Sequence, residues 1–133
     1  MSMNGWVQNV DFASTDTGEM SLDQAESLIR GHDWESERRQ FESMLERGED
    51  VCPAGIGFNA TERSVFHIYT GESTAWEIFV RMPARKKLLG FIPIGAWEYR
   101  VATDDMDEAV ELLRLYCHDQ AELEQRLQRM ERL

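Results

Sequence analysis

The chain has 133 residues, which corresponds to one domain and allows about two thirds of the unfolded surface to be buried. A hydrophobic content of 42%, with six Phe, four Trp and three Tyr, excludes a disordered chain. The net charge of −11 would repel the phosphate backbone of nucleic acids, so we expect no direct nucleic-acid binding.

The first twenty residues carry only weak structural patterns. Trp6, Gln8, Val10 and Phe12 occupy alternate positions, which predicts a short strand. The following residues 13–19 (ASTDTGE) are typical of a polar loop. We therefore expect residues 1–20 to form a partly irregular N-terminal segment.

Two helices are predicted between residues 21 and 48. Ser21 and Gln24 have the spacing of a capping box, in which each side chain bonds to the other residue's backbone N–H. Asp33 can cap the second helix, which we expect to end at Gly48 because glycine readily adopts the left-handed conformation there. The apolar residues of both segments recur at helical spacing.

Residues 55–103 have a period of two in their apolar positions, which predicts an antiparallel meander of about four strands. Turns are expected at residues 59–63, at residues 70–74 and near residues 83–86. The side chains expected to face the core are Phe66, Ile68, Trp76, Ile78, Val80, Met82, Trp97, Tyr99 and Val101.

The segment 104–133 is predicted to be helical. Asp119 and Glu122 form a possible second capping box, so we expect the helix to break near His118 and restart. The restarted part offers an apolar stripe of its own, and a homodimer through residues 119–133 is one possible use of it. The predicted fold is therefore a single α+β domain over residues 1–133. Its β-meander packs against two N-terminal helices and one long or broken C-terminal helix.

The sheet face opposite the predicted core carries a mixture of charges and aromatic rings. One interpretation is a solvated surface with cross-strand Glu–Arg pairs. The other is a binding surface, because Tyr, Phe and Arg are the side chains that most often anchor interfaces. The partner-binding candidates on this face are Tyr69, Phe79, Arg81, Glu98 and Arg100.

Catalytic and metal-binding patterns are weak. His67 and Glu77 lie on adjacent predicted strands and could form an acid–base pair, but no nucleophile or glycine-rich loop accompanies them in the sequence. The three His and two Cys fit no common metal-ligand spacing. We therefore predict no catalytic residue, no cofactor and no metal.

The segment 81–94 (RMPARKKLLGFIPI) is the only basic cluster of the sequence. It is predicted to be a hairpin whose charges protect a sheet edge from aggregation. The alternatives are a contact with a protein partner or a site for an anionic headgroup.

Acidic residues are concentrated near the two ends of the chain. Residues 1–60 carry 12 acids against 4 bases, and residues 104–133 carry 9 against 4. A field of one sign can steer a basic partner toward the protein. Glu35 and Glu42 on the second predicted helix are therefore further partner-binding candidates.

No export or membrane segment is predicted. The first thirty residues lack a basic start followed by an apolar stretch, and no apolar run approaches the roughly 18 residues of a membrane span. We expect a cytoplasmic protein that does not bind membranes. Cys52 and Cys117 permit a disulfide, but in a reducing compartment we expect both to be free thiols.

In size, acidity and the pairing of a short meander with flanking helices, the chain resembles bacterial immunity proteins, which neutralise toxin partners. The resemblance rests on no motif and transfers no functional residue. It implies a non-enzymatic domain that binds a protein with a basic surface. The alternative is a small-molecule-binding or enzymatic domain with a pocket between sheet and helices, lined by His67, Tyr69, Glu77 and Arg100.

Overall fold

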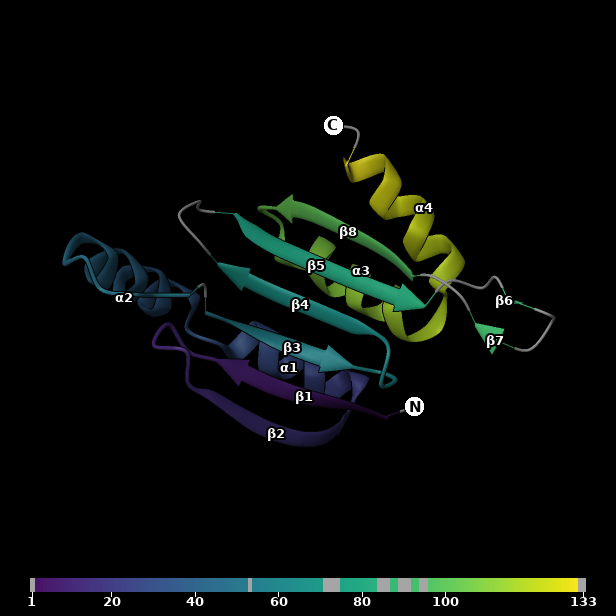
Figure 1. Cartoon of the computed structure of the whole chain (residues 1–133), viewed down its shortest axis with the longest axis horizontal. Coiled ribbons are helices and arrows are strands. Elements are labelled where there is room, and N and C mark those ends of the chain that lie inside the picture. Colours follow the sequence, from purple (N-terminus) through teal and green to yellow (C-terminus); the bar gives the residue numbers. More distant parts are fainter. Residues whose placement is uncertain are drawn as a thin grey trace.

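The structure, a computed structural model, describes residues 2–52, 54–70, 75–83, 87–88, 92–93 and 96–131. Ten longer elements and one short hairpin follow one another along the chain (Figure 1). They are β1 (Ser2–Gln8), β2 (Ser14–Ser21), α1 (Leu22–Gly31), α2 (Trp34–Glu46), β3 (Gly55–Asn59), β4 (Val65–Thr70), β5 (Trp76–Pro83), β6 (Lys87–Leu88), β7 (Ile92–Pro93), β8 (Ala96–Thr103), α3 (Met106–His118) and α4 (Gln120–Glu131).

Six strands form one sheet in the order β2-β1-β3-β4-β5-β8, with every neighbouring pair antiparallel. The predicted α+β class is confirmed, and β3, β4, β5 and β8 are the predicted meander. The sheet has six strands rather than about four, because the N-terminal hairpin β1–β2 adds two beside β3.

The polar loop expected over residues 13–19 is wrong. Residues 14–21 form strand β2 instead of a polar loop, and they pair with all of β1. β2 lies at the edge of the sheet and is mostly exposed, so it needs few apolar residues to be stable there. The predicted strand over Trp6–Phe12 also differs, since β1 ends at Gln8 and Val10 and Phe12 follow it in the turn.

The predicted starts of α1, α2 and α4 are confirmed, whereas α3 is capped by Asp105 and begins at Met106. The Gln24 backbone N–H donates to the Ser21 hydroxyl at 3.2 Å, and the Ser21 N–H donates to the Gln24 side chain at 2.8 Å. Asp33 caps α2 through the Ser36 N–H at 3.1 Å. Asp119 ends α3 and accepts the Glu122 N–H at 3.1 Å, so the C-terminal helix breaks where the sequence predicts.

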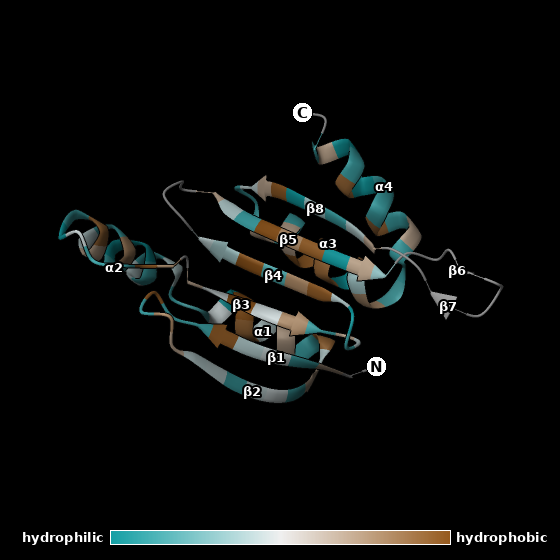
Figure 2. Cartoon of the chain, in the orientation of Figure 1, coloured by the Kyte–Doolittle hydropathy of each residue, from teal (hydrophilic) through white to brown (hydrophobic). Residues whose placement is uncertain are grey.

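The core lies on one face of the sheet, where α1 and α3 cover the strands (Figure 1), and α4 packs against β8. Most of the side chains predicted to face the core are fully buried; Trp76, Trp97 and Tyr99 are partly buried against it. Figure 2 shows that the edge strand β2 is neutral to hydrophilic and that α4, which packs on the other edge strand β8, is mostly hydrophilic. The core cluster joins strands from both halves of the chain with α1, α3 and α4.

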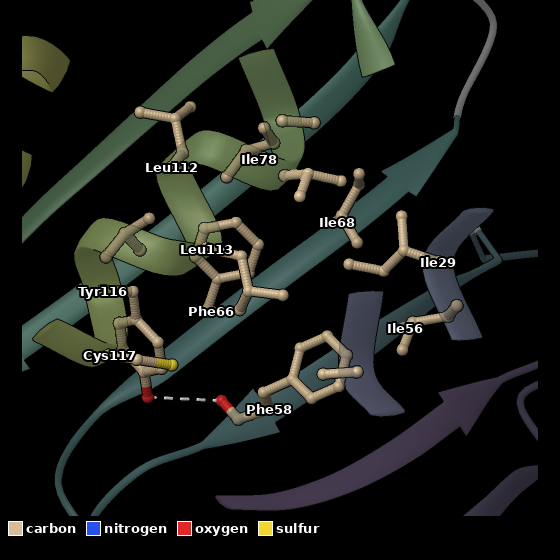
Figure 3. Packing of buried hydrophobic residues seen from close by; sticks show 14 of the residues in the cluster. Ile29, Ile56, Phe58, Phe66, Ile68, Ile78, Leu112, Leu113, Tyr116 and Cys117 are labelled. Carbon is tan, nitrogen blue, oxygen red and sulfur yellow. Dashed lines mark hydrogen bonds between the residues drawn. The ribbon is translucent and has the colours of Figure 1, made fainter. Parts of the chain in front are cut away.

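One buried hydroxyl joins the C-terminal helices to the sheet. Tyr116 of α3 packs between the rings of the core, 5.6 Å from the Phe66 ring centroid (Figure 3). Its oxygen accepts the Ala60 N–H at 2.9 Å and lies 2.7 Å from the Ser64 hydroxyl, and it also donates to the Phe58 carbonyl at 3.4 Å. The β3–β4 turn is therefore fixed to α3.

A second, smaller apolar cluster fixes α2 beside the β1–β2 turn. Val10 of the turn packs with Phe41 of α2 and with Ala54, the residue just before β3. Each of the three is buried. This cluster positions the turn at the end of the sheet, next to the first residues of β3.

The basic segment 81–94 forms a hairpin in its described part, where Lys87 pairs with Pro93 and Leu88 with Ile92. The rest of the segment between β5 and β7 lies outside the described residues, as does the predicted turn after Thr70. No helix within the described ranges is both long and apolar enough to pass through a bilayer.

Candidate functional site

The face of the sheet opposite α1 and α3, called the open face here, carries a row of side chains across five strands. Trp6, Gly57, His67, Phe79 and Arg100 are successive cross-strand partners from β1 to β8. A parallel row is formed by Gln8, Gly55, Tyr69 and Glu77. Side chains at partner positions share a face, so the strand register brings these residues together.

Two glycines of β3 lower the surface of the open face. A Cβ at Gly57 would collide with the indole of Trp6, and a Cβ at Gly55 would collide with Tyr69. The side chains of Trp6 on β1 and Tyr69 on β4 can therefore pack against the backbone of β3 from its two sides. The sequence Gly55-Ile56-Gly57 keeps Ile56 for the core and leaves no side chain on the open face.

A cavity of about 560 Å³ lies on the open face. Its size falls within the range of roughly 300–1,000 Å³ that is usual for small-molecule sites. We call it the open-face cavity, and it is lined by Gln8, Phe12, Cys52, His67, Tyr69, Glu77, Phe79 and Arg100. The pocket predicted from the sequence contains four of these residues, but its predicted place between sheet and helices is wrong.

His67 is the most perturbed group of the cavity. Burial lowers the pKa of its imidazole to about 4, because the charged form loses its hydration, so the ring is neutral at pH 7. Its Nε2 atom is buried and has no hydrogen-bond partner among the described residues. The ring lies beside two others, with centroids 6.0 Å from Trp6 and 5.0 Å from Tyr69.

The hydroxyl of Tyr69 is affected by both a cation and an anion. Burial and the nearby Glu77 carboxylate raise the pKa of the Tyr69 hydroxyl, while the charge of Arg100 and a hydrogen bond from it act in the opposite direction. The pKa of the Tyr69 hydroxyl is raised overall, so this hydroxyl is neutral at pH 7. The cavity thus contains two neutral polar groups, His67 and Tyr69 on β4, beside the charged Glu77 on β5 and Arg100 on β8.

Arg100 lies over an aromatic ring. Its guanidinium carbon is 5.2 Å from the centroid of Phe79, a distance at which the ring attracts a cation. On the same pair of strands, Arg81 and Glu98 form an ion pair with Nε and Oε1 3.6 Å apart. Both members of that pair are more than half exposed, so it contributes little to stability.

The end of the cavity beside α2 is formed by residues around the β1–β2 turn. The Cys52 thiol donates to the Asn9 carbonyl at 3.2 Å, and the Gln8 amide donates to the Cys52 sulfur at 3.5 Å. Phe12 has a φ of 71°, in the left-handed region that favours glycine, and its side chain is 59% exposed. Both thiols of the chain are free, as the sequence predicts, and Cys117 is buried in the core.

The structure brings together some of the predicted site residues and separates others. Tyr69, Phe79 and Arg100 line the open-face cavity, whereas Arg81 and Glu98 pair with each other farther along the same face. Arg81 lines a different cavity of about 510 Å³ near the β3–β4 turn. The remaining two candidates, Glu35 and Glu42, are exposed on α2.

Sequence reasoning missed Gln8, Phe12 and Cys52 as members of the site. Their inclusion depends on β1 pairing with β3, which brings the N-terminal hairpin beside the meander. A large apolar residue in a polar turn was the available signal for Phe12. Within the described residues, no three His, Cys, Asp or Glu side chains are grouped as metal ligands.

Comparison with known protein families gives no matching family. Searches among curated proteins and among solved structures likewise give no match.

Proposed function

We propose that this chain is a ligand-binding domain whose site is the open-face cavity. The observation that supports this most directly is the buried Nε2 of His67, a polar atom without a partner in the described structure, in a concave and largely aromatic surface. An unpaired buried polar atom costs roughly 1–3 kcal/mol, a cost that a ligand with a complementary group would remove. A cavity that combines such a group with a perturbed pKa is typical of a binding site.

We propose binding rather than catalysis. Acid–base catalysis by His67 near pH 7 would require an imidazole that gains a proton readily, and burial lowers its pKa to about 4. Glu77 lies near Tyr69 and acts on its pKa. Among the described residues, the hydrogen bonds of the Cys52 thiol go to Gln8, Asn9 and Val10 and not to His67. The free thiols Cys52 and Cys117 suit a reducing compartment, which supports the proposal that the protein is cytoplasmic.

The proposed function can be tested by ligand-observed NMR with a fragment set that contains cationic, neutral and anionic compounds. Hits should bind the wild-type chain and lose affinity for Tyr69→Ala, which removes one ring of the cavity. Val65→Ala is the matched control, because Val65 lies on the same strand and face but does not line the cavity. Absence of any hit sensitive to Tyr69→Ala would contradict the proposal.

A second candidate is the interaction predicted from the sequence, in which an acidic surface binds a basic protein, as in bacterial immunity or inhibitor proteins. The observation that favours it is the exposure of two large apolar side chains, Phe12 at 59% and Leu45 at 44%. Phe12 belongs to the β1–β2 turn and Leu45 to α2, and the smaller apolar cluster of Val10, Phe41 and Ala54 packs these two elements together. Glu35 and Glu42 are exposed on the same helix. An apolar anchor surrounded by acids suits a basic partner.

The two candidates differ in their response to charge reversal on α2. Glu35→Lys combined with Glu42→Lys should weaken capture of a basic protein from a native cell lysate, and raised salt should weaken capture by the wild type. The same double variant should leave the affinity of cavity-directed fragments unchanged. Retention of a stoichiometric partner by the double variant at high salt would contradict an electrostatic mode of binding.

A further inference from the structure

The open-face cavity contains a cation, Arg100, for which the described residues provide no ion-pair partner. Arg81 and Glu98 form an ion pair, but Arg100, two residues along β8 from Glu98, faces Phe79 instead. Among the residues that the structure describes, no carboxylate lies within 4.0 Å of the Arg100 guanidinium. A guanidinium held over an aromatic ring presents its remaining N–H groups in a fixed plane, which suits a carboxylate.

The second polar group that needs a partner lies on β4, two strands away from Arg100. Nε2 of His67 is buried and unpaired in the described structure, and β5 separates its strand from that of Arg100. A neutral imidazole can donate one N–H, and a carboxylate has enough lone pairs to accept from both the imidazole and the guanidinium. The two groups lie on one row of the open face, on either side of Phe79.

Aromatic rings beside the cavity offer packing surface to an aromatic ligand. The ring planes of Trp6 and His67 are inclined by 40°, and those of His67 and Tyr69 by 39°. Gly57 removes the side chain that would otherwise stand between Trp6 and His67. Of these rings, His67 and Tyr69 line the cavity, so an aromatic ligand can stack on one of them and meet the other at a tilt, which are favourable arrangements of aromatic groups.

We propose that the open-face cavity binds a small planar aromatic carboxylate, with the carboxylate on Arg100 and His67 and the ring system over His67 and Tyr69. This inference rests on the proposed function, because it names the ligand class of the same site. Glu77 lies on the Tyr69 side of the cavity and repels a second negative charge there, so a monoanion is selected over a dianion.

Three probes of nearly equal shape test the proposal: 2-naphthoate, the neutral 2-naphthamide and 2-naphthylmethylammonium. Affinities are measured by isothermal titration calorimetry on the full chain. We expect 2-naphthoate to bind at least about tenfold more tightly than the amide, because a charge-assisted bidentate bond is roughly twice as strong as a neutral one. The ammonium probe should bind most weakly.

Cys52 reports whether the probe occupies the open-face cavity. It lines the cavity and is half-buried, whereas Cys117 is buried and burial raises the pKa of its thiol to about 11. Neutral iodoacetamide should therefore alkylate Cys52 and leave Cys117 unmodified in the folded chain. The alkylation of Cys52 is followed over time by mass spectrometry. Saturating 2-naphthoate should lower its rate by about the fraction of cavities that the probe occupies.

Two variants give changes of opposite sign. Arg100→Gln should weaken 2-naphthoate binding by about tenfold or more and leave the amide unchanged, since only the charged bond is lost. Glu77→Gln should tighten 2-naphthoate binding by about threefold, because a nearby negative charge is removed. Arg81→Gln removes a cation from the same face outside the cavity and should change neither affinity. Arg100 is exposed, so its replacement should not disturb folding.

Equal or tighter binding of the amide or the ammonium probe, with no effect of Arg100→Gln, would overturn the carboxylate assignment. In that case protection of Cys52 by the other probe would still support the ligand-binding function. If none of the three probes binds, the ligand class is overturned, and the fragment comparison of Tyr69→Ala with Val65→Ala decides separately whether the cavity binds ligands at all.

Discussion

Phe12 occupies a position where its residue type is a disadvantage to the fold. Its φ of 71° places a bulky side chain in the left-handed region, which costs a residue other than glycine about 1–2 kcal/mol. The exposed ring recovers little of this cost by burial, since it is 59% exposed. Backbone strain that does not stabilise the fold is often found at residues that bind a ligand. Phe12 lines the open-face cavity, so we attribute its strained conformation to ligand binding.

Phe12→Gly should raise the free energy of unfolding by about 0.5–1 kcal/mol, the relief of strain less the greater chain entropy of glycine. The same change should weaken the binding of cavity ligands. Urea denaturation and calorimetry measure the two effects. Gly48→Ala is the matched control, because Gly48 has a φ of 74° and its replacement should lower stability. A loss of stability in Phe12→Gly would contradict the assignment of strain.

His67 makes stability depend on pH. The imidazole has its ordinary pKa near 6.5 in the unfolded chain and about 4 in the folded chain, so the unfolded state binds the proton more readily. The stabilisation is therefore complete above about pH 6.5 and is lost as the pH falls through 4. Between pH 7 and pH 5 the expected loss is about 2 kcal/mol.

The measurement is urea denaturation of the wild type and of His67→Phe at pH 7 and pH 5. The variant lacks the imidazole, so its stability should fall by less over this interval, and the difference between the two proteins isolates His67 from His32 and His118. Equal losses in both proteins would show that His67 does not titrate as the structure indicates.

At the scale of residues, the sequence predicted the open face better than the site on it. Period-two alternation places His67, Tyr69, Phe79 and Arg100 on one face without knowledge of strand order. It cannot show that Gly57 receives the indole of Trp6, because that contact depends on a pairing between distant segments. The hollow in the face and the burial of His67 follow from the same pairing.

Among the elements, α3 and the β3–β4 turn are joined by the hydroxyl of Tyr116. Tyr116→Phe leaves the Ala60 N–H without the acceptor that it has at 2.9 Å, and the expected loss of stability is about 1–3 kcal/mol. Tyr99→Phe is the control: its hydroxyl accepts from Gln128 at 3.0 Å at a half-buried site, where water can replace it. Thermal or urea denaturation checks both, and equal losses would contradict a special role of the buried bond.

The elements themselves differ in how well the sequence predicts them. Helix starts have local chemical markers, such as the Ser21 capping box, and these are confirmed. Strand β2 has no such marker, because an edge strand is stabilised by the backbone of its neighbour more than by its own side chains. A polar sequence is therefore compatible with either a loop or an edge strand, and only the presence of β1 decides between them.

For the whole molecule, a homodimer through residues 119–133, one use offered above for the apolar stripe there, remains to be tested. Leu123 and Leu127 of α4 are fully buried in the chain's own core, so truncation after Asp119 would expose the core as well as remove a contact surface. The intact chain is the better sample. A dimer through the outer face of α4 should give twice the mass of 15.5 kDa in light scattering and become monomeric in Arg129→Glu. A mass of one chain at high concentration would contradict the dimer.

The glycines of β3 have one more consequence, for the folding chain. The meander β3-β4-β5-β8 is contiguous in sequence, whereas β1 must reach β3 across two helices, so the pairing of β1 with β3 closes a long loop. Until it does, β3 is the free edge of the meander. An edge strand that contains Gly55 and Gly57 has weak strand propensity and is a poor template for a second chain. We therefore expect the glycines that shape the cavity also to make the partly folded protein less prone to aggregation.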